Sequence, residues 1–194
     1  MMSIVRTRKL ARVFAKSAII AALAVPALLP GLAFAAPYDP PSVPTKIQVP
    51  AGNVAFLVGH ATGTQNYTCQ LSSSGYAWTL VGPAATLVDD KGKQLMTHYT
   101  GPTWKANDGS TVVGARVDGV TMSPSAVPWL LLRAMSPSQG SDGGDRLTHT
   151  TYIQRVNTTG GLPPASVCDA ATVGAASNVA YTADYYFYKA VEAS

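Results

Sequence analysis

Histidines are the side chains of this sequence best suited to metal or acid–base chemistry, and there are three of them: His60, His98 and His149. Neutral imidazoles bind zinc and copper, and a folded sheet can gather residues that lie far apart in the chain. No two of these histidines stand two positions apart, the spacing that would place both on one face of a strand. We therefore predict no metal site and no cofactor.

Carboxylates are the second candidates for chemistry. Glycoside hydrolysis needs two facing carboxyl groups, and the only glutamate is Glu192, close to the end of the chain. Most aspartates, Asp108 among them, stand beside glycine or in turn-like segments, where capping is their ordinary role. Asp184 lies in an aromatic run, where we favour a structural pairing with a tyrosine or an arginine. The alternative is an exported enzyme, with or without a metal, that uses His98 with Asp108 or Asp184.

Aromatic side chains are the third candidates, since the chain holds nine tyrosines and three tryptophans. Trp104 follows a Gly-Pro turn and precedes the turn Asn107-Asp-Gly109, so we expect it near an exposed loop rim. Tryptophan and tyrosine stack on sugar rings while polar neighbours bind the hydroxyl groups. The alternative, which is the commoner outcome for tryptophan, is that Trp78, Trp104 and Trp129 all fill the core. The predicted ligand-binding residues are Tyr99, Trp104, Asp108, Tyr186 and Tyr188.

The motifs of several large enzyme classes are missing. The chain has no G-x-G-x-x-G after a strand-like run, no P-loop, no H-E-x-x-H and no G-x-S-x-G. A dehydrogenase or hydrolase assignment therefore has no support from motifs.

Net charge argues against nucleic acid as a partner. The charge of +4 comes from 14 Lys and Arg against 10 Asp and Glu, but five of the basic residues lie within the first 16 positions, where no acidic residue occurs. The rest of the chain holds nine basic residues against ten acidic ones. It has no basic excess that would neutralise phosphates.

The first 35 residues have the pattern of an export signal. A basic stretch precedes an apolar run, and Ala33-Phe-Ala35 forms a small-x-small cleavage site before Ala36. The apolar run is too short for a membrane anchor and is interrupted by Pro26 and Pro30. We predict a signal peptide over residues 1–35, a periplasmic or extracellular protein, and no membrane span after cleavage.

The two cysteines, Cys69 and Cys168, both lie in the part that would be exported. An even number of cysteines in an oxidising compartment favours a disulfide, with two buried free thiols as the alternative. Neither cysteine has a second cysteine or a histidine at ligand spacing, which argues against a metal site.

Short β-type runs separated by turn residues make up the exported part. Residues 36–47 are rich in proline and predict an extended arm without a helix. Turn signals such as Ser72–Gly75, Asp89–Gly92 and Asn107–Gly109 then separate apolar or alternating runs. The pattern is typical of an antiparallel sandwich or barrel. We predict an all-β fold over residues 48–190, an antiparallel β-sandwich or jelly-roll-like single domain.

A small outer-membrane barrel would also read as alternating strands. The run Pro128-Trp-Leu-Leu-Leu132 is continuous rather than alternating, and several of the strands are very short. We therefore disfavour that alternative.

Six phrases of the chain stand out together: Thr64–Cys69, His98–Trp104 with Asp108–Ser110, Val127–Leu132, Thr151–Thr158, Cys168-Asp169 and Tyr181–Tyr188. In the same order, they resemble the uncharacterised secreted family called domain of unknown function 3455, found in bacteria and fungi. The resemblance covers roughly residues 48–188 and implies an exported, single-domain, β-rich protein, but no activity and no catalytic residues. Both cysteines match the family pattern, which supports the disulfide, whereas His60 and His149 lie outside it.

These observations favour an exported, non-catalytic binding protein for an extracellular or cell-envelope ligand, with a glycan as the preferred ligand. The exported enzyme described above is one alternative. A structural or stress-related envelope protein without a small ligand is the other.

Overall fold

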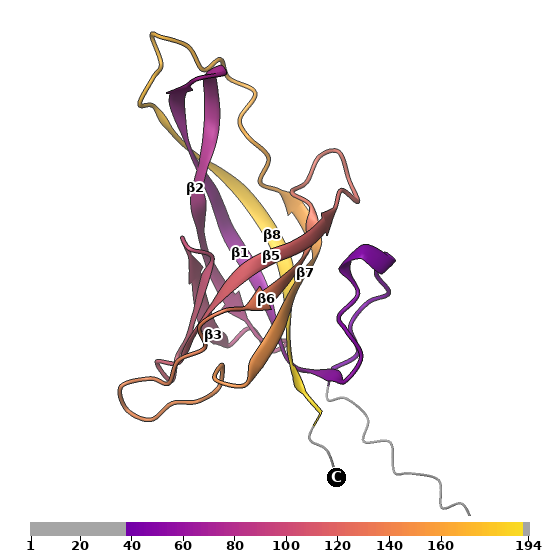
Figure 1. The fold of residues 1–194 in the computed structure, drawn as a ribbon. Helices are drawn as coiled ribbons and strands as arrows, with labels where there is room; N and C mark the ends of the chain where they lie inside the picture. The colour runs from indigo at the N-terminus through magenta and orange to yellow at the C-terminus, as the bar shows by residue number, and fades with distance from the viewer. Residues whose placement is uncertain (1–37, 192–194) are drawn as a thin grey trace, which may run out of the picture. The chain divides into compact units, whose positions relative to one another are not determined.

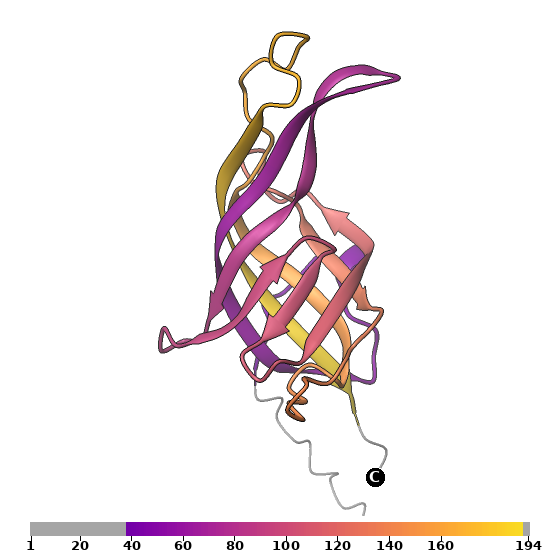
Figure 2. The ribbon, with the colours of Figure 1, turned by 90° about the vertical axis from the view of Figure 1, so that its left-hand side faces the viewer.

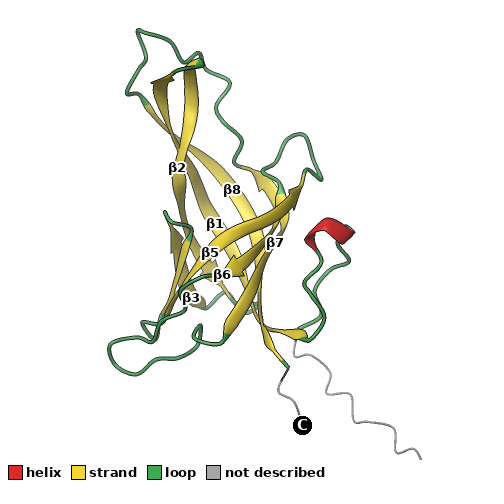
Figure 3. Ribbon diagram, viewed as in Figure 1, coloured by secondary structure: helices red, strands yellow, loops and turns green. Residues whose placement is uncertain are grey.

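Eight antiparallel strands form the protein's structure, a computed structural model that describes residues 38–191. The predicted signal peptide, residues 1–35, lies outside the described residues. The strands, shown in Figures 1 and 3, are β1 (Asn53–Ser72), β2 (Gly75–Val88), β3 (Gln94–Tyr99), β4 (Thr103–Ala106), β5 (Thr111–Val120), β6 (Trp129–Ala134), β7 (Thr150–Gly160) and β8 (Ala176–Ala190).

Each strand pairs with the next along the chain, and β8 pairs with β1, so the sheet closes into a barrel. The β1–β8 pairing runs from Asn53 opposite Ala190 to Thr68 opposite Ala176 and leaves neither strand with a free edge. The predicted all-β, antiparallel class is confirmed. The strands form one closed sheet, however, where the sandwich or jelly-roll prediction would have two stacked sheets.

β1 is a single strand of 20 residues that continues through two glycines. Gly59 and Gly63 lie within the strand, where the neighbouring strand β2 approaches closely. A Cβ atom on Gly59 would lie 2.9 Å from Leu87 Cδ2, and one on Gly63 would overlap Ala85. These glycines therefore permit close packing inside the barrel and do not end the strand.

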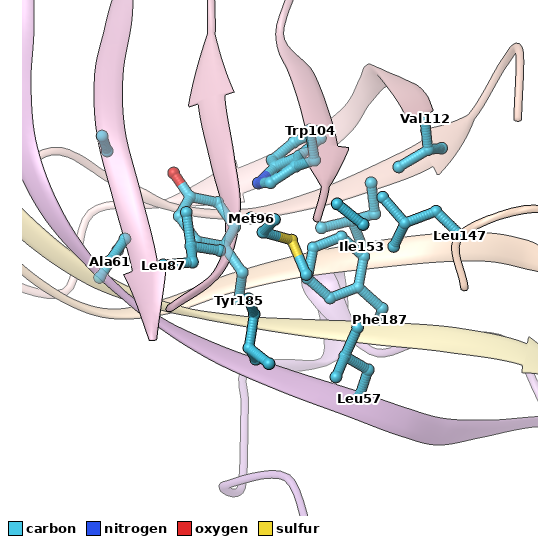
Figure 4. Close-up of a cluster of buried hydrophobic side chains, with 14 of the residues drawn as sticks. Leu57, Ala61, Leu87, Met96, Trp104, Val112, Leu147, Ile153, Tyr185 and Phe187 are labelled. Carbon is cyan, nitrogen blue, oxygen red and sulfur yellow. The ribbon is translucent and has the colours of Figure 1, made fainter. Parts of the chain in front are cut away.

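Apolar side chains fill the barrel interior toward the end at which β1 begins and β8 ends. Alternate residues of β8, including Tyr185 and Phe187, point inward and are buried, as the alternation of that run predicted. Figure 4 shows them meeting inward-facing residues from the other strands. This cluster includes Leu57, Ala61, Leu87, Met96, Trp104, Val112, Leu147 and Ile153.

The proline-rich arm packs on the outside of the barrel and differs from the prediction in one respect. It contains a single 3-10 turn, η1 (Thr45–Ile47), in which Ile47 N–H donates to the Pro44 carbonyl at 3.0 Å. Ile47 is fully buried, and its carbonyl accepts a 2.6 Å hydrogen bond from Gln154 Nε2. Burial of this one apolar residue explains why the arm makes a turn instead of remaining extended.

A hairpin formed by β1 and β2 projects beyond the rest of the barrel, beside the loop of residues 161–175 (Figure 2). The disulfide Cys69–Cys168 joins this hairpin to that loop, which confirms the predicted bridge. Backbone hydrogen bonds between Cys69 and the pair Gly174 and Ala175 strengthen the same connection. Among residues 38–191, no helix has the length and apolar character needed to cross a membrane.

Candidate functional site

A cavity of about 460 Å³ opens at the end of the barrel from which the hairpin projects. The strands alternate in direction, so every second connection lies at the same end of the barrel. The β1–β2, β3–β4, β5–β6 and β7–β8 connections lie at the end where the cavity opens. The cavity is lined by Gln65, Tyr67, Leu80, Val81, Gly82, Pro83, His98, Gly101, Pro102, Trp104, Arg116, Val127, Pro128, Leu130, Leu132, Arg155, Leu162, Pro163 and Tyr185.

The floor of the cavity is a group of stacked aromatic rings. The His98 and Trp104 rings are nearly parallel, with centroids 4.1 Å apart, and Tyr185 meets both edge-on. Gly114 makes room for the indole, because a Cβ atom there would lie 3.1 Å from Trp104 Cζ3. These contacts fix the rings where the packed core ends and the open lumen begins.

His98 is a neutral imidazole at this floor. Burial is the main reason that its pKa falls to about 3, and the nearby charge of Arg155 lowers it further, against the opposing effect of a hydrogen bond to Thr103. The Nδ1 atom lies 2.9 Å from the Thr103 carbonyl oxygen. A carbonyl only accepts, so Nδ1 carries the proton and Nε2 of the neutral ring carries a lone pair.

Two buried nitrogen atoms within the described residues have no hydrogen-bond partner, and both belong to cavity-lining residues. They are Gln65 Nε2 and the indole Nε1 of Trp104. In Figure 4 the indole nitrogen lies on the same side of the cluster as the Tyr185 hydroxyl. A buried donor without a partner in the protein is rare and is ordinarily completed by an ordered water or by a bound molecule.

The cavity wall also carries two arginines, which are the only charged lining residues among residues 38–191. Arg155 points inward from β7, and its Nε and Nη2 atoms donate to the Pro128 carbonyl at 3.1 and 2.8 Å. Arg116 comes from β5 nearer the mouth, where its guanidinium lies beside Gly119 and Leu130. None of the described lining residues is acidic.

The wall above the floor is held by contacts between distant segments. The Tyr67 hydroxyl donates a 2.7 Å hydrogen bond to the Gly161 carbonyl, which ties β1 to the start of the β7–β8 loop. The Thr158 hydroxyl donates to the Val127 carbonyl at 2.6 Å. Together with the disulfide, these bonds give the cavity a fixed wall on the hairpin side.

The five predicted ligand-binding residues do not form one surface. Trp104 is only 1 % exposed, so its predicted position at an exposed rim is wrong. The reason is the short strand β4, which the sequence did not reveal and which directs Trp104 and Ala106 inward and Lys105 outward. Trp104 does line the cavity, so a ligand can still reach its ring from inside.

Asp108 lies in the β4–β5 turn, at the opposite end of the barrel from the cavity. Its carboxylate accepts hydrogen bonds from Ser110 N–H, the Ser110 hydroxyl and Arg146 N–H at 3.0, 2.6 and 2.9 Å. All of these are contacts within the loops, so the observed role is the capping that aspartates in turns commonly have.

The three tyrosines of the predicted set are not arranged as a stacking surface. Tyr99 is exposed at the end of β3, and Tyr186 is half-buried on β8. Tyr188 is buried, and its hydroxyl donates to Gln154 Oε1 at 2.8 Å. Tyr186 and Tyr188 do share the outer face of β8, as predicted, but only Tyr186 of the two remains accessible.

A cluster of polar side chains that the sequence did not reveal lies on the outer face, where β1 pairs with β8. His60 Nδ1 lies 2.6 Å from Asp184 Oδ1, and His60 Nε2 lies 2.8 Å from Asp90 Oδ1. Asn157, which has a positive φ of 51°, donates to Asp184 Oδ2 at 2.7 Å. The hydrogen bond to Asp184, followed by that to Asp90, raises the pKa of His60 above its ordinary 6.5.

This cluster corrects the predicted catalytic pairs. Asp184 has the structural partner that the sequence predicted, but this partner is His60, not a tyrosine or an arginine. His98 lies inside the barrel, whereas Asp184 lies on its outer face and Asp108 in the turn at the far end. Within residues 38–191, no three histidine, cysteine or carboxylate side chains are grouped so that they could hold a metal ion.

Comparison with known proteins gives a family but no described relative. No curated protein and no solved structure matches the chain. The model of the family described as "Protein of unknown function (DUF3455)" matches residues 50–189, which include all eight strands except Ala190, the last residue of β8. The chain therefore belongs to the DUF3455 family, as its residue phrases predicted.

Proposed function

We propose that this protein is a non-catalytic binding protein that holds a small, mainly apolar molecule in the barrel cavity. The observation that carries the proposal is a lumen of about 460 Å³ whose lining residues include two buried donors without partners. Cavities of about 300–1,000 Å³ with apolar walls and a few polar groups are the usual form of small-molecule sites. The mouth of a small closed barrel is one of the places where they occur.

The lining favours an apolar ligand over a glycan. Leucine, valine, proline and aromatic residues make up most of the wall, and a sugar would leave most of its hydroxyl groups there without partners. The preference for a glycan rested on a solvent-facing Trp104, and the burial of this residue removes that support.

The same lining supports binding without catalysis. No serine, cysteine, lysine or carboxylate lines the cavity, so the common nucleophiles are absent from the described wall. His98 has a pKa of about 3, far from the range in which a histidine exchanges protons efficiently near neutral pH. Its hydrogen bond to Thr103 and its stack on Trp104 give it a structural role.

Export remains part of the proposal. The Cys69–Cys168 disulfide is compatible with a periplasmic or extracellular location, since such bridges persist in oxidising compartments. The predicted signal peptide would direct the protein there. A binding protein outside the cytoplasm would sequester or carry a sparingly soluble molecule.

The test uses N-phenyl-1-naphthylamine, a neutral apolar dye that fluoresces on transfer from water to an apolar site. We expect saturable binding to the disulfide-bonded protein and its loss in Leu130→Trp, which fills the lumen. Val117→Trp is the matched control, because Val117 is exposed on β5 and does not line the cavity. Absence of binding to the unaltered protein, or equal binding to the folded Leu130→Trp variant, would overturn the proposal.

A further inference from the structure

Two guanidinium groups face the lumen from neighbouring levels of the barrel wall. On β7 the inward residues are Ile153 and Arg155, and on β5 they are Val112, Gly114 and Arg116. Arg116 Nη2 lies on the lumen side, since a Cβ atom on Gly119 would meet both it and Leu130 Cδ2. Arg155 is half-buried and stands deeper than the exposed Arg116.

Neither arginine has an acidic partner. Both ion pairs found within residues 38–191 belong to His60 on the outer face. Within residues 38–191, the Arg155 guanidinium donates to the Pro128 carbonyl and also lies in hydrogen-bonding reach of the Tyr185 hydroxyl, and both acceptors are neutral. A charge withdrawn from water is normally paired, so an unpaired arginine inside a barrel indicates a missing anion.

The charge of Arg155 reaches the aromatic floor. It lowers the pKa of His98 and opposes the rise in pKa that burial causes in Tyr185. The net pKa of Tyr185 is still raised, so its hydroxyl keeps its proton near neutral pH. The floor therefore carries no negative charge that would balance the arginine.

Donors predominate among the polar groups available to a ligand. The indole Nε1 of Trp104 can only donate, and the guanidinium groups of Arg116 and Arg155 can only donate. Gln65 Nε2 is a further donor without a partner. This set matches a group that accepts several hydrogen bonds and carries a negative charge.

We propose that the ligand of this cavity is an apolar monocarboxylate, with its carboxylate bound by Arg155 and Arg116 and its apolar part against Leu130, Leu132 and Val127. The guanidinium fork matches the two oxygens of a carboxylate, and such charge-assisted bonds are stronger than neutral ones. This inference rests on the proposed function, because it names the chemical class that the same cavity would take.

The experiment measures displacement of the bound naphthylamine dye by decanoate and by its uncharged methyl ester. In the unaltered protein we expect decanoate to bind at least about tenfold more tightly than the ester, from the strength of hydrogen bonds between charged groups. Arg155→Gln should weaken decanoate about ten- to a hundredfold and change the ester less than about threefold. Equal affinities for decanoate and the ester in the unaltered protein would overturn the proposal.

Matched variants separate the charge from the fold. Arg133→Gln removes an exposed arginine of β6 that does not line the cavity, and it should leave decanoate binding unchanged. Arg116→Gln alters an exposed side chain, so it keeps the test available if Arg155→Gln fails to fold. It too should weaken decanoate selectively. Unchanged decanoate binding in Arg116→Gln and in folded Arg155→Gln would refute the assignment.

The two proposals fail in different ways. If the dye binds but decanoate has no advantage over the ester, the carboxylate inference is wrong and the apolar cavity site stands. If neither the dye nor either decanoate compound binds the unaltered protein, the proposed function itself is wrong.

Discussion

Replacing Trp104 by alanine should destabilise the barrel by about 3–5 kcal/mol, the usual cost of truncating a large buried aromatic side chain. Trp104 is 1 % exposed, stacks on His98 and meets Tyr185 and Phe187 edge-on at centroid distances of 5.3 and 5.9 Å. Domains have a total stability of about 5–15 kcal/mol, so this loss is a large share of it. The melting temperature should fall by about 6–20 °C for a domain of this size.

The assay is guanidinium denaturation followed by circular dichroism, which gives the free energy of unfolding from the midpoint and slope. Trp78→Ala is the matched control, because Trp78 lies on the projecting hairpin and loses mainly its 2.8 Å hydrogen bond to the Ser166 carbonyl. That loss should cost about 0.5–1.5 kcal/mol. A cost below about 1 kcal/mol for Trp104→Ala, or one equal to that of Trp78→Ala, would refute the buried position of Trp104.

Three further changes test the outer cluster, the disulfide and the far loop. His60→Gln should remove a stabilisation that is fully present below about pH 6.5 and is lost as the pH rises through the raised pKa of folded His60. Thermal melts of both proteins from about pH 5 to pH 9 should show a difference in melting temperature that becomes smaller as the pH rises. A difference that stays constant with pH would contradict the ion pairs. Replacing Cys69 and Cys168 together by serine should lower the free energy of unfolding by about 2–5 kcal/mol, since the bridge closes a separation of 99 residues; an unchanged denaturation midpoint would argue against this. Asp108→Ala should cost about 1–3 kcal/mol through three lost hydrogen bonds while dye binding stays unchanged; loss of binding would return Asp108 to the ligand site.

Local patterns predicted the local features of the fold. The turns at Ser72–Gly75, Asp89–Gly92 and Asn107–Gly109 connect consecutive strands, because glycine and aspartate set these turn geometries within a few residues. The alternation in Tyr181–Tyr188 predicted that Tyr181, Tyr185 and Phe187 share one face of β8, since the period of a strand is two, but Tyr188 on the other face is buried as well.

Features that depend on pairing between distant strands could not be predicted from one sequence. Closure of the barrel requires β1 to pair with β8, and nothing in the local pattern of either strand specifies that partner. The same pairing places His60 directly opposite Asp184, so their contact was hidden for the same reason. The sequence instead suggested a tyrosine or an arginine as the partner of Asp184, and the enzyme alternative paired Asp184 with His98, which faces the opposite side of the sheet.

The position of Trp104 was missed although a signal was present. The segment Thr103-Trp-Lys-Ala106 alternates between polar and apolar residues, but it is only four residues long and lies between two turns. Its short length made a loop the simpler interpretation. The polar Lys105 between two small or apolar neighbours is the feature that indicates a strand with Trp104 on the inner face.

At the level of the cavity, the run of small or apolar inward-facing residues is interrupted on three separate strands. Inward positions are small or apolar along most of β1, β5 and β7, but they hold Gln65, Arg116 and Arg155 at the level of the cavity. Long polar side chains at these positions cannot complete an apolar core, so the packing stops at the ring of Trp104 and leaves a lumen above it. Departures from an otherwise consistent pattern are expected at functional sites. Two of the three residues, Arg116 and Arg155, are cations, and no acidic side chain of the described wall balances their charge. A ligand that the cavity would bind therefore explains the cavity better than a packing defect does.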